Sequence, residues 1–134
     1  MEKETKDKLV NHVNKHKWWR TSVPEEKEVS DRGMFFASSY RDAEFYGKPI
    51  NEPFNVSISN PLVGDEQYIM AVLELDAPSQ DISVKDRFAL DAKIKNKASK
   101  MGYDSIVLMT TKGYERYRTT GAMPRSIELN VIKT

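Results

Sequence analysis

The chain has 134 residues, a formal net charge of +1 at pH 7 and no cysteine. This length suits one domain with one core, and the small net charge does not by itself require a nucleic-acid partner. The lack of cysteine excludes disulfides, thiolate nucleophiles and cysteine-based zinc sites. No apolar run has membrane-spanning length and no signal-peptide pattern occurs, so we expect a soluble, cytoplasmic protein without a membrane partner.

The N-terminal segment, residues 2–17, predicts a polar helix with two apolar anchors, Leu9 and Val13. His12 and His16 are four residues apart, so they share one face of this helix and could hold a metal ion. No third ligand lies near them in the sequence, so we interpret this face as solvated and expect no metal site.

Two strands are predicted in the first third of the chain. The pair Trp18-Trp19 precedes Arg20 and Thr21 and indicates a strand that enters the core. Residues 34–37 form a short apolar run with the length of a buried strand.

A serine pair and a short helix follow this second strand. Ser39 has Asp42 three residues further on, a capping-box pattern that places the start of a helix at Ser39. Ala43 and Tyr46 are three residues apart and share one face of that helix.

The middle of the chain predicts two further strands and the longest helix. Residues 54–59 alternate apolar and polar side chains, as a half-buried strand does. Residues 68–75 are nearly continuously apolar and predict a buried strand, with a helix as the alternative. Ser83 begins a second capping-box pattern, so residues 84–101 predict a helix that Gly102 ends.

The last third predicts two strands around a loop. Residues 103–109 are rich in Ile and Val and indicate a strand, and the polar residues 110–123 indicate a long, mobile loop. Residues 126–133 alternate and predict a final strand with Glu128 off the core face. Together the elements predict an α+β fold: a single domain with a split or antiparallel β-sheet core and flanking helices.

The order of several motifs resembles that of the ADP-ribosyltransferase fold family, which includes many small NAD-dependent transferases of phages and bacteria. Arg20-Thr21 stands where the family carries an Arg or His on its first strand, followed by a small or hydroxyl residue. Ser38 and Ser39 stand where an aromatic-rich strand of the family ends in a Ser/Thr motif. Tyr46 completes the family's Ala-x-x-Tyr pattern on the helix that follows.

Glu128 is the last piece of this resemblance. The family carries its catalytic glutamate on a late strand that follows a long loop, and Glu128 has that place in the order. Ser126 stands where the members that modify side chains have a Glu or Gln, which argues against arginine as the acceptor. The resemblance covers residues 18–134 as an ADP-ribosyltransferase-like domain and leaves residues 1–17 as an N-terminal helical extension.

The resemblance implies an enzyme that breaks the nicotinamide–ribose bond of NAD and transfers ADP-ribose to a macromolecule, as a phage or bacterial effector would. NAD is then a substrate, and the acceptor is a protein, or alternatively a nucleic acid. The implied catalytic residues are Glu128 and Ser38. The implied NAD-binding residues are Arg20, Thr21, Ser39 and Tyr46.

Two other functions fit the same sequence. The domain could be an inactive binding module on the transferase scaffold. It could also be a small nucleic-acid-binding domain that uses the lysines of residues 85–100 and the tyrosines and arginines of residues 110–123. Turnover of NAD would distinguish the enzyme from both, and salt-sensitive retention on DNA or RNA would identify the last.

Overall fold

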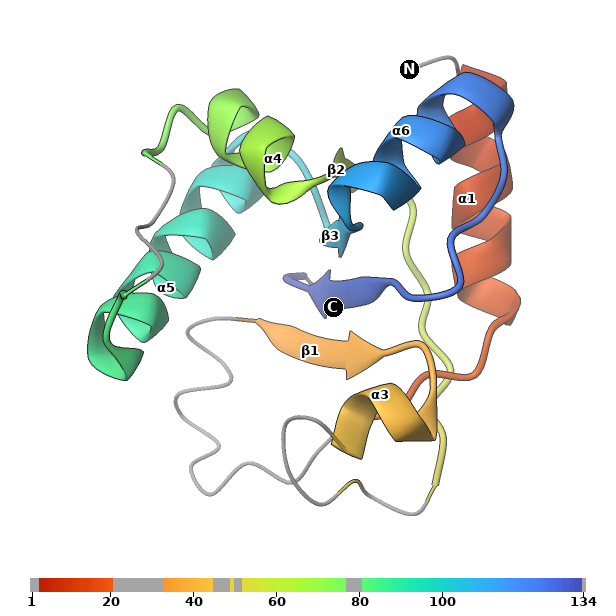
Figure 1. The fold of residues 1–134 in the computed structure, drawn as a ribbon, viewed down its shortest axis with the longest axis horizontal. Helices are drawn as coiled ribbons and strands as arrows, with labels where there is room; N and C mark the ends of the chain where they lie inside the picture. Colours follow the sequence, from red (N-terminus) through yellow and green to blue (C-terminus); the bar gives the residue numbers. More distant parts are fainter. Residues whose placement is uncertain (1–2, 21–32, 45–48, 50–51, 77–80, 134) are drawn as a thin grey trace.

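A four-stranded sheet lies at the centre of the computed structural model, in the order β1-β4-β3-β2 (Figure 1). The structure describes residues 3–20, 33–44, 49, 52–76 and 81–133. The strands are β1 (Met34–Ala37), β2 (Pro61–Gly64), β3 (Ser105–Leu108) and β4 (Glu128–Val131).

Strand direction brings four chain segments to one edge of the sheet. β2 and β3 are parallel, and β4 is antiparallel to both β1 and β3. β1, β2 and β3 therefore end at the same edge, and β4 begins there. Glu128, the first residue of β4, lies opposite Ala37 of β1 and Leu108 of β3. We call this the carboxyl edge.

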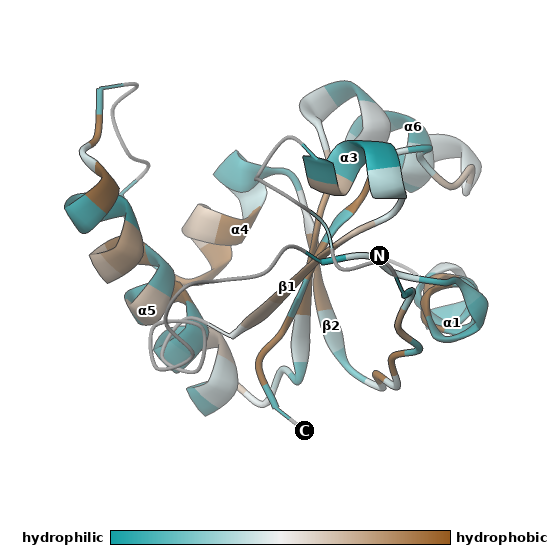
Figure 2. Cartoon of the chain, turned by 90° about the horizontal axis from the view of Figure 1, so that it is seen from below, coloured by the Kyte–Doolittle hydropathy of each residue, from teal (hydrophilic) through white to brown (hydrophobic). Residues whose placement is uncertain are grey.

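Helices cover both faces of the sheet (Figures 1 and 2). Among the described residues the helices are α1 (Lys3–Lys15), α3 (Tyr40–Glu44), α4 (Glu66–Val72), α5 (Val84–Lys100) and α6 (Thr111–Thr120). α1 and α6 pack on one face, and α4 and α5 pack on the other. The predicted α+β class is confirmed, but the sheet is mixed because β2 and β3 are parallel.

Each face of the sheet has its own apolar cluster. The larger cluster joins Val13 of α1 and Tyr117 of α6 to Leu129 of β4. The smaller cluster joins Ile69 of α4 to Ile106 of β3. A fully buried side chain of this kind stabilises the fold by roughly 1.5–3 kcal/mol, so both faces contribute to stability.

α1 confirms the N-terminal helix and is bonded directly to the rest of the fold. The Tyr117 hydroxyl donates to the Thr5 carbonyl at 2.9 Å, and the Trp18 indole N–H donates to the Val13 carbonyl at 2.9 Å. Its anchors Leu9 and Val13 belong to the larger cluster. The segment that the sequence set apart as an extension thus shares a core with the sheet.

Two predicted helix starts are confirmed by their capping bonds. Ser39 accepts a hydrogen bond from the Asp42 amide at 3.0 Å at the start of α3, and Ser83 accepts one from the Asp86 amide at 3.1 Å at the start of α5. Gly102 follows α5 with a φ of 95°, a left-handed conformation that glycine adopts without strain. The strands at residues 34–37, 103–109 and 126–133 are confirmed as β1, β3 and β4.

The strand predicted at residues 54–59 is wrong. Within this segment only Phe54 pairs, in a single bridge to Trp18. Side chains bind the backbone where a strand partner would: the Ile58 amide donates to Asn14 Oδ1 at 2.8 Å, and the Ser59 amide donates to Asp104 Oδ2 at 2.7 Å. The apolar alternation reflects packing against the core, and the true strand, β2, begins at Pro61.

Two further segments are helical where the sequence favoured other structures. Residues 68–75 fall largely in α4, the helical alternative, whose start is capped by Asp65 accepting from the Tyr68 amide at 2.8 Å. The loop predicted at residues 110–123 is wrong, because it contains α6. Thr110 accepts from the Gly113 amide at 3.0 Å and caps this helix. Among the helices described, none has the length and apolar character to cross a membrane.

The Asp104 carboxylate holds the segment before β2 against β3. It accepts hydrogen bonds from the Ser59 amide, the Ser59 hydroxyl, the Asn60 amide and the Ser105 hydroxyl, at 2.7 to 3.1 Å. Partial burial alone would raise the pKa of Asp104, but these hydrogen bonds outweigh it and lower the pKa below its ordinary value.

Replacing Asp104 by Asn is expected to lower the free energy of unfolding at pH 7 by about 1–3 kcal/mol, because an amide NH2 would face backbone donors. A lowered folded-state pKa means that the carboxylate stabilises the fold above its unfolded pKa, and that this is lost as pH falls through the folded value. Urea unfolding should therefore show the parent and variant converging in the acid range below about pH 3.9. Asp7→Asn, at an exposed position of α1, is the control. If Asp104→Asn lowered the free energy of unfolding as much in the acid range as at pH 7, this role of the charge would be contradicted.

Candidate functional site

A cleft of about 590 Å³ opens at the carboxyl edge. It is bordered by the end of β1, the start of α3, the β2–α4 and β3–α6 turns, and the start of β4. The residues that line it and are used below are Ala37, Arg41, Asp42, Asp65, Glu66, Ser126 and Glu128. Segments that are far apart in the sequence, from Ala37 to Glu128, thus meet at one opening, as concave ligand sites commonly require.

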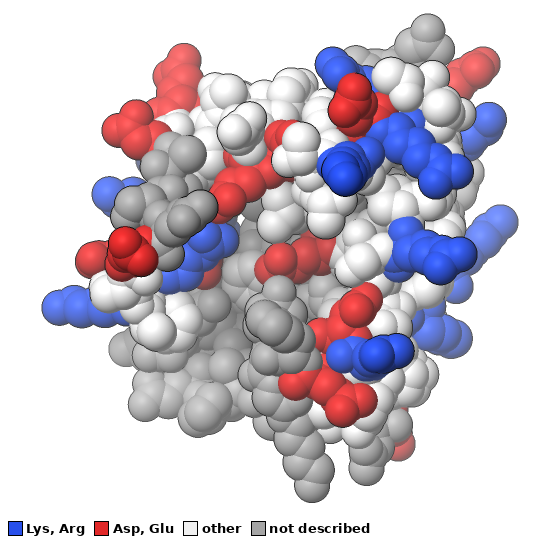
Figure 3. Space-filling model, viewed as in Figure 1, with Lys and Arg blue, Asp and Glu red and all other residues white. Residues whose placement is uncertain are grey.

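The cleft is acidic. Asp42, Asp65, Glu66 and Glu128 line it, and Arg41 is the one Lys or Arg among its described lining residues. Figure 3 shows acidic side chains bordering the hollowed middle of this face, while basic side chains gather toward the side of α6 and α1. Such a cleft favours a positively charged group at its centre.

Ser38 sits beside the start of β4 and is held by several bonds. Its hydroxyl accepts from the Ile127 amide at 3.4 Å and lies 3.2 Å from Asp42 Oδ2. The Ser126 hydroxyl donates to the same Asp42 oxygen at 3.2 Å. On the other side, His16 Nε2 of the N-terminal segment donates to the Ser38 carbonyl at 2.6 Å. Ser38 is therefore fixed between His16, which follows α1, and Ile127, which precedes β4.

Glu128 is half-buried. It lies on the sheet face that α4 and α5 cover, because its neighbour Leu129 packs in the cluster on the opposite face. There it borders both the cleft and a smaller cavity of about 50 Å³. Burial raises the pKa of Glu128, Arg87 opposes that rise, and Asp91 and Glu66 add to it.

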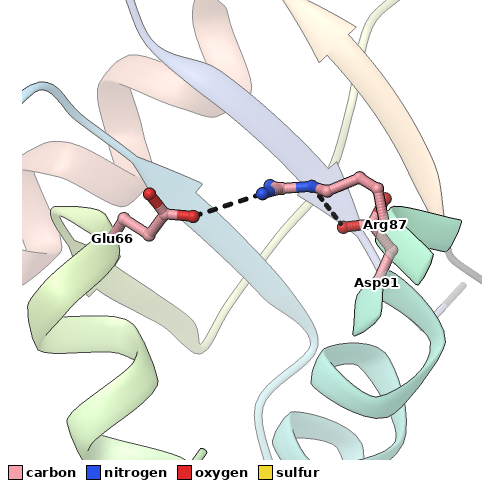
Figure 4. A network of polar contacts seen from close by, with 3 residues as sticks. All are labelled: Glu66, Arg87 and Asp91. Atoms are coloured by element: carbon pink, nitrogen blue, oxygen red, sulfur yellow. Dashed lines mark hydrogen bonds and ion pairs between the residues drawn. The ribbon is translucent and has the colours of Figure 1, made fainter. Parts of the chain in front are cut away.

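The cavity beside Glu128 contains a network of charged side chains (Figure 4). Arg87 of α5 forms an ion pair of 3.3 Å with Glu66 of α4 and one of 3.4 Å with Asp91, one turn along its own helix. The sequence analysis missed all three residues. The Arg87–Asp91 spacing of four residues was a usable signal for a pair on one helix face, but nothing local linked the pair to Glu128.

The predicted site residues are not all brought together. Glu128 lines the cleft opposite Ala37, and Ser38 bonds to Ile127, the residue before Glu128. Arg20 lies elsewhere: its guanidinium carbon is 5.7 Å from the ring centre of Phe36, which packs on the face opposite Glu128. The Ser39 hydroxyl is occupied as the cap of α3.

Thr21 and Tyr46 lie outside the residues that the structure describes. His12 and His16, the candidate metal pair, have stacked rings with centres 5.6 Å apart. Across the described part of the chain, no group of three or more His, Cys, Asp or Glu side chains is arranged to hold a metal ion.

No family model, curated protein or solved structure matches this chain. The chemistry of the cleft must therefore be inferred from its own side chains.

These side chains offer two kinds of function. Ser38 and Ser126 supply hydroxyl groups next to the Asp42 carboxylate, an arrangement that can bind hydroxyl-rich ligands such as sugars. Glu128 supplies a carboxylate in a poorly solvated position, where its interaction with a nearby positive charge is stronger than in water.

Proposed function

We propose that the protein is an NAD-dependent ADP-ribosyltransferase and that its domain is a variant of the ADP-ribosyltransferase fold. One observation carries this proposal. Glu128 lines an acidic cleft opposite Ala37, and the hydroxyl of Ser38, the next residue along, accepts from the amide of Ile127, the residue before Glu128, so the family's serine and glutamate positions, far apart in the sequence, meet at one end of the sheet. The cleft volume of about 590 Å³ is in the range of small-molecule and cofactor sites.

The reaction would break the bond between ribose C1′ and the nicotinamide nitrogen. The bonding electrons leave with the ring, which departs as neutral nicotinamide, and C1′ becomes an oxocarbenium-like centre. A nucleophile of the acceptor then bonds to C1′ and loses its proton to solvent. The step needs no oxidant and no metal, and it needs a negative group near the ribose, as glycoside hydrolysis does.

Glu128 would supply that negative group. Its carboxylate is partly removed from water, so it stabilises the developing positive charge more strongly than an exposed carboxylate would. The surrounding acidic side chains also favour the cationic nicotinamide ring over the neutral product, which promotes release. Ser38, with Asp42, would bind a ribose hydroxyl and orient it toward Glu128.

The phosphates of NAD need a cation at the cleft. The resemblance gave this role to Arg20, but the Arg20 guanidinium packs on Phe36 on the other face of the sheet. Arg41, an exposed residue of α3 that lines the cleft, is better placed to meet a phosphate. We therefore assign phosphate binding to Arg41 within this proposal.

A direct assay tests the proposal. The full chain is incubated with a cell extract and NAD that is labelled in its adenylate part, and both free nicotinamide and macromolecule-bound label are measured. We expect nicotinamide release together with bound label, and digestion by protease or nuclease then identifies the acceptor as protein or nucleic acid. If no extract supports nicotinamide release, the proposal fails in favour of a binding module. Salt-sensitive retention on DNA or RNA without turnover would instead favour the nucleic-acid-binding function.

A further inference from the structure

Three carboxylates and one guanidinium gather between α4, α5 and the sheet. Arg87 bonds to Glu66 at 3.3 Å and to Asp91 at 3.4 Å (Figure 4). Glu128 borders the same cavity, which has a volume of about 50 Å³ and is partly open to solvent. Arg87 and Glu128 therefore face one small pocket.

We propose that Arg87 is a positioning residue that supplies the counter-charge of the Glu128 carboxylate across the pocket that both line, while Glu66 and Asp91 hold the Arg87 guanidinium between α4 and α5. This inference rests on the proposed function, which requires a negative Glu128.

The fixed position of Arg87 follows from its two partners. Asp91 is only 8% exposed and lies one helical turn from Arg87, so it restrains the guanidinium from the α5 side. Glu66 restrains it from α4. The two ion pairs restrict the rotation of the Arg87 side chain, and the restraint from Asp91 is the stronger one, because 40% of the Arg87 side chain and 50% of the Glu66 side chain are exposed to solvent.

The charges around Glu128 show why one arginine matters. From α4 and α5 it faces the carboxylates of Glu66 and Asp91 and the guanidinium of Arg87. Across the cleft, α3 contributes Arg41 and Asp42, and the turn before α4 contributes Asp65. The neighbouring strands present the apolar Phe35, Ala37 and Leu108. Negative groups thus outnumber positive ones, and Arg87 is the positive group among the described residues that line this pocket.

Removing the Arg87 charge is expected to raise the pKa of Glu128. Without its positive charge, burial and the two remaining carboxylates act unopposed, so the pKa of Glu128 rises further. The ionised fraction of Glu128 then falls at any pH near that value. Each unit of upward shift lowers activity about tenfold at pH values below the titration midpoint. Binding of NAD should hardly change, because Arg87 does not line the cleft.

The experiment follows the Glu128 carboxyl by carbon-13 NMR in the full chain, with its resonance assigned by its loss in Glu128→Gln. We expect Arg87→Gln to move the Glu128 titration midpoint to higher pH. Arg87→Lys keeps the positive charge, so its midpoint should lie close to that of the parent. The acidic limb of kcat for NAD cleavage should move by the same amount, with KM unchanged. Arg116→Gln, at an exposed position of α6, is the matched control and should move nothing.

Glu66→Gln is a second variant that removes a negative charge and so should move the Glu128 midpoint to lower pH, which keeps the test valid if Arg87→Gln does not fold. A Glu128 midpoint that is unchanged in Arg87→Gln, or in Glu66→Gln when that variant alone folds, would overturn the inference. Failure of the proposed function is a separate result, because the NMR titration needs no NAD turnover. Titration shifts without any NAD cleavage would refute the enzyme while supporting the charge coupling.

Discussion

Replacement of Glu128 by Gln is expected to lower nicotinamide release from NAD by about a hundredfold or more, the scale of losing one electrostatic stabiliser of a transition state. Gln keeps the shape of the side chain and its hydrogen-bonding capacity but removes the charge. Most NAD affinity should remain, because the carboxylate acts mainly on charge that develops in the transition state. Release of nicotinamide at the parental rate would show that Glu128 is not catalytic.

The same substitution has an unusual expected effect on stability. Burial raises the pKa of Glu128, so folding disfavours its ionised form. The parent therefore loses stability as pH rises from the ordinary glutamate value of about 4.3 to the raised value, and it stays lower above that range. Glu128→Gln lacks this loss, so its Tm at pH 7 should equal or exceed that of the parent.

A matched variant separates these effects from a general change of charge. Glu115→Gln makes the same chemical change at an exposed position of α6. It should leave both nicotinamide release and the pH dependence of Tm unchanged, since exposed substitutions usually alter stability by no more than about 0.5 kcal/mol. A lower Tm for Glu128→Gln at pH 7 would mean that the Glu128 charge stabilises the fold, contrary to the direction of its pKa shift.

Trp18→Ala is expected to lower the free energy of unfolding by about 3–5 kcal/mol, the range for truncating a buried tryptophan. The Trp18 side chain is 0% exposed, donates to the Val13 carbonyl, and meets the His16 ring edge-on with centres 5.0 Å apart. Its backbone also pairs with Phe54. The loss is a large part of the roughly 5–15 kcal/mol by which a domain is stable.

Urea unfolding measures this loss, and Trp18→Phe provides the comparison. Phe keeps an aromatic ring but lacks the indole N–H, so the loss should be smaller than for Ala. A loss below about 1 kcal/mol for Trp18→Ala, the level of a typical surface change, would show that α1 and the Trp18 segment are separable from the core. A loss in the expected range would show that residues 1–17 are an integral part of the domain.

Local chemistry explains which elements the sequence could predict. α3 and α5 begin at Ser39 and Ser83, whose hydroxyl groups accept from an amide three residues further on, and such caps depend only on neighbouring residues. β4 was visible because Ile127 and Leu129 alternate with polar residues. For α6, the cap at Thr110 and the spacing of Tyr114 and Tyr117 were also present, but the many polar residues obscured them.

Long-range contacts account for the elements that the sequence did not predict. Residues 54–59 have strand alternation, yet Asn14 and Asp104 bind their backbone from distant parts of the chain. The site shows the same division. Motif order nominated Ser38 and Glu128, and the structure bonds the Ser38 hydroxyl to the amide of Ile127, the residue before Glu128. Motif order gave no information on Arg87, because Arg87 and Glu128 line one pocket only once α5 packs on the sheet.

The position of β4 has a consequence for how the chain acquires its structure. β4 follows the other three strands in sequence but lies between β1 and β3 in space. During synthesis, which proceeds from the N-terminus, β1 and β3 are made first and remain without the strand that joins them. Pairings this distant in sequence form slowly, and unpaired apolar strands are the places where partly synthesised chains associate with one another. The same insertion that places Glu128 opposite Ala37 thus leaves the nascent chain with unpaired strand edges until β4 has been translated.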